Sequence, residues 1–202
     1  MNSSTVQRRT LAATVLVAVL ALTACGDGDP PSPSPTTPGA ATTSATFNAA
    51  DVAFATDMIP HHRQATAMAD HAAGRAGSAS VRQLAARIRA AQDPEIRTMS
   101  AWLADRGKPV PSAGPTAGHG DGHAGTPGMV SDADMARMMA SGGPALDRLF
   151  LTLMITHHEG AITMAKEELA GGSDPGARQL AGRIIDAQTA EIATMKRMLA
   201  TG

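Results

Sequence analysis

An internal duplication constrains the fold of this chain more than any other feature of its sequence. Residues 54–103 align without a gap onto residues 150–199, and 22 of these 50 positions are identical. So many identities at one fixed offset of 96 residues indicate that a single structural unit occurs twice. We therefore expect the two halves to adopt the same local structure and to pack as related units.

Each copy is predicted to form two helices. Apolar residues recur at three- and four-residue spacing, alanine is frequent and β-branched runs are absent. Helix starts are indicated by the capping-box spacing of Asn48 with Asp51 and of Ser80 with Gln83, and by an aspartate followed by proline at residues 174–175. We expect an all-α fold, a four-helix bundle made of two duplicated hairpins with a short extra helix in the central connection.

The other segments differ from the repeats in composition. Residues 1–24 combine two arginines with a short apolar run and are predicted to be a lipoprotein signal peptide. Residues 25–46 are rich in Pro, Ser and Thr and are predicted to be a disordered tether. The duplicated domain is predicted to span residues 47–202. Its expected parts are repeat 1 (about 47–107), a loop with the short helix (108–143) and repeat 2 (about 144–202).

Cys25 is the only cysteine of the chain, and it ends the sequence Leu22-Thr23-Ala24-Cys25, which resembles the lipobox of bacterial lipoproteins. A lipid on this thiol would hold the domain at the outer face of the membrane, in the cell envelope. The alternative is an uncleaved anchor with an incidental cysteine, which also places the domain outside. With the thiol lipidated, a soft metal ligand in the domain must come from methionine, and the chain has 12 Met, of which all but Met1 lie in the mature part.

Polar residues fall within the apolar faces of the predicted helices. At 100° per residue, His61 and His62 lie in the apolar arc of the first helix, and Gln92 and Glu95 lie in that of the second. The duplication repeats this arrangement at His157, His158, Gln188 and Glu191. Burying polar side chains without partners is costly, so these residues must satisfy one another or bind a ligand.

Two interpretations of these buried polar residues are open. One is a hydrogen-bonded His-Glu-Gln network that fixes helix register. The other is a metal site in which a carboxylate orients a histidine through its second ring nitrogen, and the repeated Met-x-x-His-His sequence favours it. The predicted metal ligands are His61, His62, His157, His158, Met58, Met154, Met68 and Met164. The predicted outer-shell or alternative ligands are Glu95, Glu191, Gln92 and Gln188.

Ligand type indicates which metal such a site would take. Imidazole with thioether sulfur suits a copper ion as Cu(I), or Ag(I), whereas zinc bound through His and Glu, or no metal at all, are the alternatives. A further accessory site is predicted in the Gly/Pro/His connection at His119, His123 and Met129, where a merely hydrophilic linker is the competing interpretation. Met99, Met195 and Met198 are predicted to fill the core.

Charge and aromatic content argue against nucleic acid as a partner. The formal net charge is −1, no basic stripe is present, and the chain has no Tyr and one Trp. The expected partners are a metal ion and, through the lipid, a membrane. Nothing in the sequence identifies a protein partner.

The histidine motifs resemble a known bacterial family. They read Met-Ile-Pro-His-His at residues 58–62 and Met-Ile-Thr-His-His-Glu-Gly-Ala at residues 154–161, preceded by Asp-Arg-Leu-Phe-Leu at residues 147–151. These sequences resemble the domain-of-unknown-function 305 family. The resemblance implies an exported, helical protein with a ferritin-like fold, and it implies copper binding or copper tolerance.

The leading hypothesis is therefore a lipid-anchored protein that sequesters or passes on copper and is not an enzyme. A metal-free interaction module of the envelope is the first alternative. A di-iron enzyme is the second, but such a site needs paired Glu-x-x-His motifs that neither copy contains.

Overall fold

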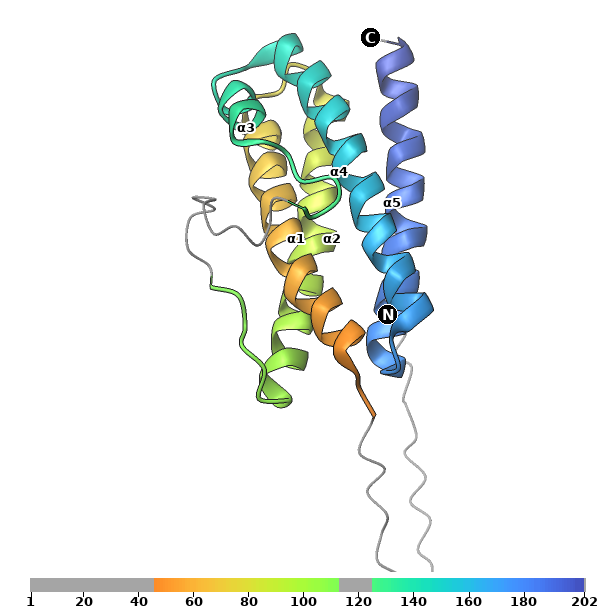
Figure 1. Cartoon of the computed structure of the whole chain (residues 1–202). Coiled ribbons are helices and arrows are strands. Elements are labelled where there is room, and N and C mark those ends of the chain that lie inside the picture. Colours follow the sequence, from red (N-terminus) through yellow and green to blue (C-terminus); the bar gives the residue numbers. More distant parts are fainter. Residues whose placement is uncertain (1–45, 113–124, 202) are drawn as a thin grey trace, which may run out of the picture. The chain divides into compact units, whose positions relative to one another are not determined.

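The computed structural model describes residues 46–112 and 125–201, which form five helices and no strand (Figure 1). The long helices are α1 (Ala49–Arg75), α2 (Ala79–Asp105), α4 (Gly143–Gly171) and α5 (Pro175–Thr201), and the short helix α3 (Asp132–Met139) lies in the central connection. This architecture confirms the predicted all-α fold. The predicted signal peptide and all of the predicted tether except Thr46 lie outside the described residues.

The four long helices form two hairpins. α1 pairs with α2 and α4 pairs with α5, and the hairpins contact each other mainly through α1 and α4. These two helices are antiparallel, since Asn48 Nδ2 at the start of α1 donates to the Gly171 carbonyl at the end of α4 over 2.7 Å. At the opposite end, Ala76 follows α1 and lies beside Gly143, where α4 begins.

Asp51 near the start of α1 and its repeat equivalent Asp147 near the start of α4 each bind the backbone that precedes a helix of the other hairpin. Asp51 in α1 accepts hydrogen bonds from the backbone N–H groups of residues 173 and 174, at 3.0 and 2.9 Å. Asp147 in α4 accepts from the N–H groups of residues 77 and 78, at 2.8 and 2.9 Å. These N–H groups precede α5 and α2, and Asp51 and Asp147 are equivalent positions of the repeat. These bonds therefore join the hairpins reciprocally.

Local capping follows the sequence prediction only in part. The capping box of Asn48 and Asp51 is present, with Asn48 accepting from the helix and Asp51 accepting from the Asn48 N–H. The capping box predicted at residues 80–83 is wrong, because α2 begins earlier, after Ser78, whose side chain makes no capping bond. Asp147 of the other hairpin instead accepts from the N–H groups of residues 77 and 78, which precede the helix.

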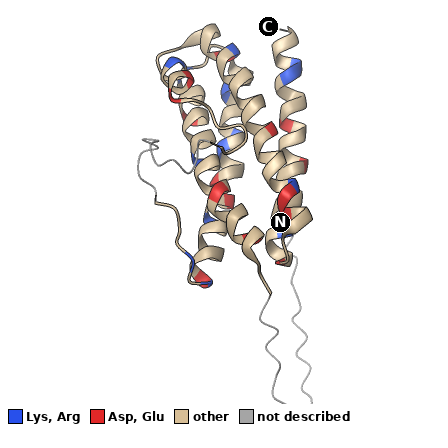
Figure 2. Cartoon of the chain, viewed as in Figure 1, with Lys and Arg blue, Asp and Glu red and all other residues tan. Residues whose placement is uncertain are grey.

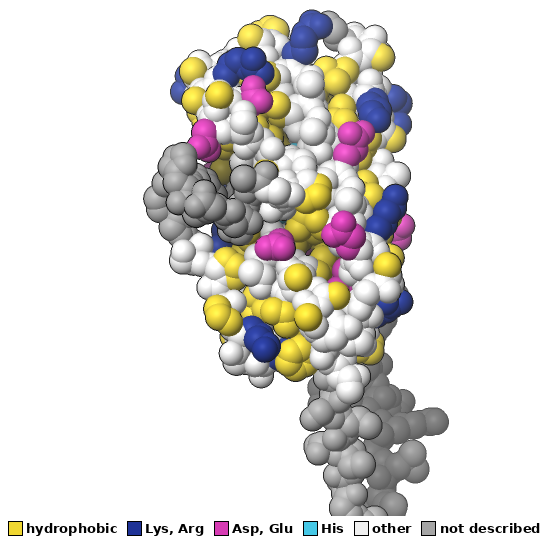
Figure 3. Space-filling view, in the orientation of Figure 1, with side chains coloured by type: hydrophobic (Ala, Val, Ile, Leu, Met, Phe, Trp, Pro, Cys, Tyr) yellow, Lys and Arg dark blue, Asp and Glu magenta, His cyan; other side chains and the backbone are white. Residues whose placement is uncertain are grey.

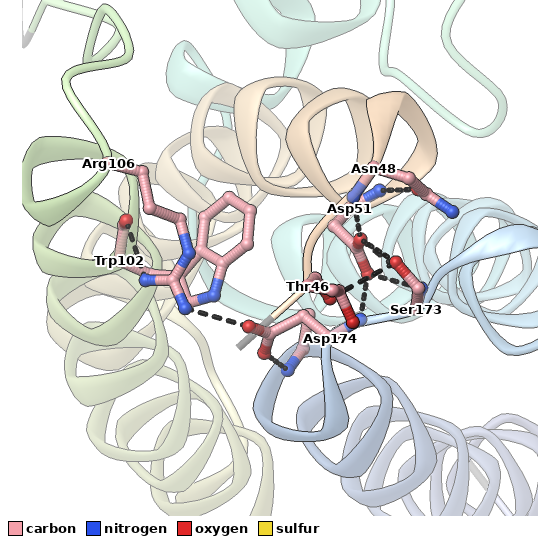
Figure 4. A network of polar contacts seen from close by, with 8 residues as sticks. Thr46, Asn48, Asp51, Trp102, Arg106, Ser173 and Asp174 are labelled. Atoms are coloured by element: carbon pink, nitrogen blue, oxygen red, sulfur yellow. Dashed lines mark hydrogen bonds and ion pairs between the residues drawn. The ribbon is translucent and has the colours of Figure 1, made fainter. Parts of the chain in front are cut away.

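The start of α5 carries a network of polar contacts that joins both hairpins (Figure 4). Asp174 caps α5 as predicted, its Oδ1 accepting from the Ala177 N–H over 2.9 Å. Its Oδ2 accepts from Arg106 in the C-cap of α2 over 2.7 Å. Arg106 also lies 4.1 Å from the centre of the Trp102 ring. The only tryptophan of the chain thus contributes to the contact between α2 and α5.

A buried carboxyl group, Glu168 of α4, lies beside Asp51 and has Ala72 as its repeat equivalent. Burial and the neighbouring Asp51 raise the pKa of Glu168 to about 8, so this group is protonated at neutral pH. Gly172 makes room for it, since a Cβ at that position would overlap the Glu168 carboxyl group. This buried carboxyl group therefore occurs in the second copy of the repeat and not in the first, which has alanine at the equivalent position.

Two apolar clusters flank the middle of α1 and α4, and they are related by the repeat. One of them includes Phe54, Met58, Met99, Met164 and Ile184. The other includes Phe150, Met154, Met195, Met68 and Ile88. Every residue of the first list matches a residue of the second at the offset of 96. The core therefore consists of two equivalent halves with the central turns of α1 and α4 between them.

Acidic and basic residues are interspersed along the helices, without a stripe of one sign (Figure 2). The face in Figure 3 likewise shows charged side chains of both signs among hydrophobic ones. Within residues 46–112 and 125–201, no helix combines the length and the apolar character that a membrane span requires.

Candidate metal centre

Four histidines occupy the middle of the α1–α4 interface. His61 and His62 come from α1, His157 and His158 come from α4, and all four are 0% exposed. They lie in the central turns because each pair falls on the apolar face of its helix, between the two apolar clusters. The structure thus brings together the two histidine pairs that the sequence predicted as ligands.

The second histidine of each pair contacts a glutamate of its own hairpin. His62 Nε2 donates to Glu95 Oε2 over 2.8 Å, and His158 Nε2 donates to Glu191 Oε2 over 2.7 Å. The glutamate side chains are 19% and 20% exposed, so each links a buried imidazole to the protein surface. In both pairs Nδ1 is the nitrogen left for another ligand.

The first histidines of the two pairs face each other. The ring centroids of His61 and His157 are 3.8 Å apart, with 37° between the ring planes. Because His157 is the repeat equivalent of His61, this contact lies where the pseudo-two-fold axis passes between α1 and α4. Each of these rings therefore contacts its own counterpart.

Both facing rings are neutral at physiological pH. Burial, together with the neighbouring His62, lowers the pKa of His61 to about 3. Burial and the neighbouring histidines hold the pKa of His157 well below its usual range. A neutral imidazole keeps one nitrogen lone pair, which is what a metal ion requires of histidine.

Several buried polar atoms of the four histidines and of two glutamines find no hydrogen-bond partner within the described part of the chain. They are Nδ1 of all four histidines, Nε2 of His157, both side-chain polar atoms of Gln92 and Oε1 of Gln188. Buried polar atoms in folded proteins usually have a partner, so these imidazole nitrogens are available to a ligand. The donor chemistry of this centre therefore fits a metal ion that binds imidazole.

The donor set also restricts how an ion could bind. Among the described residues, no group of three or more His, Cys, Asp or Glu side chains is close enough to enclose a metal ion. Methionine sulfur is a further kind of donor in this region. Met58 and Met154 precede the histidine pairs by one turn and are fully buried.

The other predicted ligands are distributed over the two apolar clusters. Met164 lies with Met58 in one cluster, and Met68 lies with Met154 in the other. All four sulfur-bearing side chains are buried, with Met164 the most exposed at 6%. Of the predicted accessory site, Met129 is half-buried, whereas His119 and His123 lie outside the described residues, as does Cys25.

A feature that the sequence analysis missed is the segment at residues 126–130, which we call the strap. The Pro127 carbonyl accepts a hydrogen bond from His61 Nε2 over 3.1 Å. Gln64 and Gly160 are the residues of α1 and α4 that bring the strap close to the helices. A sequence signal existed, because these two residues are equivalent positions of the repeat that differ in chemistry.

Comparisons with known proteins give a consistent result. The family described as Domain of unknown function (DUF305) matches residues 51–199. A DUF305 protein of Streptomyces coelicolor, described as secreted, has 32% identity and a TM-score of 0.67, and the match covers 75% of this chain and 93% of that one. A DUF305 fragment from Deinococcus radiodurans has 33% identity and a TM-score of 0.68, with 77% and 98% covered.

A third similar structure is CopM in its Cu(I)-bound form, with 29% identity and a TM-score of 0.61, covering 75% of this chain and 96% of CopM. CopM structures with bound Cu(II), with bound silver and without metal are also similar to this chain. Among curated proteins, none matches the chain.

Proposed function

Because this chain belongs to the DUF305 family, we propose that it is an extracytoplasmic protein that binds copper, as Cu(I), and sequesters or transfers it without catalysing a reaction. The observation that carries this proposal is the group of four buried histidines whose Nδ1 atoms have no partner among the described residues. CopM, a structural neighbour at 29% identity, binds this ion.

The two glutamates support a metal-binding role for the histidines. Histidine ligands in proteins commonly donate their other ring N–H to a carboxylate, which fixes the ring and increases its basicity. His62 with Glu95 and His158 with Glu191 have this arrangement. We assign the histidines as ligands and the two glutamates as the groups that orient them.

Methionine determines the preference for a soft ion. With Cys25 reserved for lipid, the thioethers of Met58 and Met154 are the soft donors nearest the histidine pairs, and Met68 and Met164 lie two turns away. Thioether with imidazole favours Cu(I) over zinc, which would need the carboxylates as ligands. Gln92 and Gln188 complete the polar set as alternative ligands.

The cellular location belongs to the same proposal. The predicted signal peptide and the lipid on Cys25 would place the domain at the outer face of the membrane, at the end of a tether of about 20 residues. The similar protein from Streptomyces coelicolor is described as secreted. At this location the chain would meet copper before the ion enters the cytoplasm.

A Cu(I) titration of the purified chain carrying Cys25→Ser, which removes its only thiol, tests the proposal. We expect saturable binding that His61→Asn combined with His157→Asn weakens by at least about tenfold. His71→Gln is the matched control, since His71 lies on α1 outside this centre and contacts the Ser141 carbonyl. Ag(I) serves as an air-stable probe of the same site.

Two results would overturn the copper assignment. One is binding that the double histidine variant leaves unchanged. The other is identical thermal stability with and without Cu(I), which would favour the metal-free interaction module, in which the histidines and glutamates only fix helix register.

A further inference from the structure

The strap crosses the α1–α4 interface directly at the histidine centre. Its Pro127 carbonyl contacts His61 on α1, and Gly128 lies against the backbone of residues 156–160 on α4. Gly128 has a φ of +77°, which favours glycine. A Cβ at this position would lie 2.7 Å from the Thr156 carbonyl oxygen. The strap therefore follows the helix surface without an intervening side chain.

Gln64 attaches the strap to α1. Its Nε2 donates to the Val130 carbonyl over 2.9 Å, and its Oε1 accepts from the Val130 N–H over 2.8 Å. Gln64 is 5% exposed, and Val130 is also buried. A primary amide is suited to this contact because it offers a donor and an acceptor side by side, as a neighbouring strand would.

Gly160 provides the matching space on α4. A Cβ at this position would overlap the Pro127 carbonyl group and would lie 2.6 Å from Gly128 Cα. Gly160 stands in the interior of a helix, where glycine is unfavourable by itself. Its presence is explained by the close approach of the strap.

The contact with Pro127 determines which nitrogen of His61 carries hydrogen. A carbonyl oxygen only accepts, so His61 Nε2 must donate, and the neutral ring then keeps its lone pair on Nδ1. His61 thus has the same tautomer that Glu95 and Glu191 impose on His62 and His158. The Pro127 carbonyl thus fixes the tautomer of His61 in the same way that a glutamate fixes the tautomer of His62 and of His158.

We propose that Gln64 is a positioning residue for the metal centre, which holds the Pro127 carbonyl against His61 and so reserves His61 Nδ1 as the ligating nitrogen. This inference rests on the proposed copper function. Gln64 itself contacts no ligand atom; it acts through the strap. Gly160 contributes to the same arrangement, because it has no Cβ and so leaves space for the Pro127 carbonyl group that Gln64 positions.

The test uses two variants that displace the strap by different means. Gln64→Leu removes both bonds to Val130, and Gly160→Ala fills the space of the Pro127 carbonyl without changing Gln64 or His61. Gly182→Ala in α5 is the matched glycine control, because a Cβ there meets nothing within 4 Å. Gln83→Leu, at an exposed position of α2, is the matched glutamine control.

The first measurement is the 15N NMR spectrum of the metal-free chain, with the His61 signals assigned by their loss in His61→Asn. In the wild type and in both controls we expect a protonated Nε2 and an unprotonated Nδ1. In Gln64→Leu and Gly160→Ala we expect the two nitrogen signals to move towards each other as the second tautomer becomes populated. Unchanged His61 signals in both variants would overturn the proposal.

The second measurement is the affinity for Cu(I), and for Ag(I) as the second probe. Loss of an outer-shell partner typically lowers metal affinity about 10–100-fold, and we expect this loss in both variants but in neither control. Wild-type affinity in both variants would overturn the proposal. A wild-type chain that binds no Cu(I) would instead refute the proposed function, and the His61 tautomer would still show whether Gln64 acts through the strap.

Discussion

At the scale of single residues, burial decides the chemistry of His61 and His157. Both rings are completely buried and lie against each other, so a positive charge on either ring is strongly unfavourable. Their pKa values are lowered, to about 3 for His61 and well below the usual range for His157. A metal ion that bound these two rings would therefore not have to displace a proton from an imidazolium at neutral pH.

These lowered pKa values predict that the metal-free fold loses stability in acid. Below pH 6.5 the unfolded chain binds protons at both histidines, whereas folded His61 stays neutral until about pH 3. The free energy of unfolding therefore decreases as the pH falls from 6.5 towards 3, by up to about 1.4 kcal/mol per pH unit for each histidine. Urea unfolding at several pH values, compared with His61→Asn combined with His157→Asn, measures this slope.

The double variant should show a shallower dependence on pH in that window, and His71→Gln should keep the wild-type slope. Equal slopes in the wild type and the double variant would contradict the assigned protonation states.

Glu168 predicts a pH dependence of opposite sign. Unfolded Glu168 loses its proton near pH 4.5, whereas the folded carboxyl group keeps it until about pH 8. The contribution of Glu168 to the free energy of unfolding of the wild type therefore decreases as the pH rises from 4.5 to 8. The side chain of Glu168→Gln does not titrate and removes this loss, so the variant should gain stability relative to wild type between pH 5 and pH 8.

Thermal unfolding of both proteins at the two pH values measures the gain, and Glu167→Gln at the adjacent exposed position is the control. A constant difference between Glu168→Gln and wild type at pH 5 and pH 8 would show that the Glu168 pKa is not raised.

The sequence predicted the buried histidines because helical periodicity fixes which side chains of α1 and α4 face the core. It also predicted that carboxylates would orient histidines, since Glu95 and Glu191 share a face with Leu84 and Leu180. The unlike repeat pair Gln64 and Gly160 marks a position of special contact, but the sequence does not show that residues 126–130 make this contact with His61. Residues 126–130 have no periodicity, and their approach depends on the space at Gly160, which only the packed helices define.

At the scale of helices, the reciprocal aspartate contacts fix how one hairpin meets the other. Asp51 and Asp147 each accept two backbone N–H bonds across the α1–α4 interface, so each helix start is completed by the opposite hairpin. The capping box predicted at residues 80–83 is absent because α2 begins after Ser78. Capping rules consider neighbours in sequence, whereas Asp147 is about 70 residues away from the N–H groups that it binds.

Removing either of the two aspartates should lower the stability of the fold, but by different amounts. Asp147→Ala removes two bonds at a half-buried site and should cost about 1–2 kcal/mol of stability. Asp51→Ala should cost more, because Asp51 is fully buried and also accepts from the Asn48 N–H and supports Glu168. Urea unfolding at pH 7 measures both, with Asp186→Ala at an exposed position of α5 as the control. Equal small losses for the two variants would contradict the reciprocal contacts.

At the scale of the whole molecule, the duplication explains the features that the two hairpins share, but it does not explain the features that occur only once. Apolar clusters, glutamate–histidine pairs and the Asp51 and Asp147 contacts all occur twice, and the repeat predicted this for the histidines and glutamates. The strap and Glu168 occur once, at positions where the copies differ: Gln64 against Gly160 and Ala72 against Glu168. The two halves of the centre are therefore related in geometry and unequal in chemistry.

The proposed anchor predicts where the chain resides. In cells that express the full chain, wild type should separate with the detergent phase in a detergent phase-partition experiment, because the diacylglycerol on Cys25 is strongly hydrophobic. Cys25→Ser should move the protein to the aqueous phase or leave it with an uncleaved signal peptide. Labelling with a radioactive fatty acid should mark only the wild type. Equal labelling of both chains would refute lipidation at Cys25.

The contact of His61 with His157 is a residue meeting its own counterpart across a two-fold axis, which is the geometry of an isologous dimer interface. In a dimer of identical hairpins, every substitution at this interface would appear on both sides at once. Joining the hairpins in one chain removes that restriction, so one side can gain a glutamine while the other becomes glycine. In this chain the strap uses that freedom, because it meets the two helices at unlike members of one repeat position, Gln64 on α1 and Gly160 on α4.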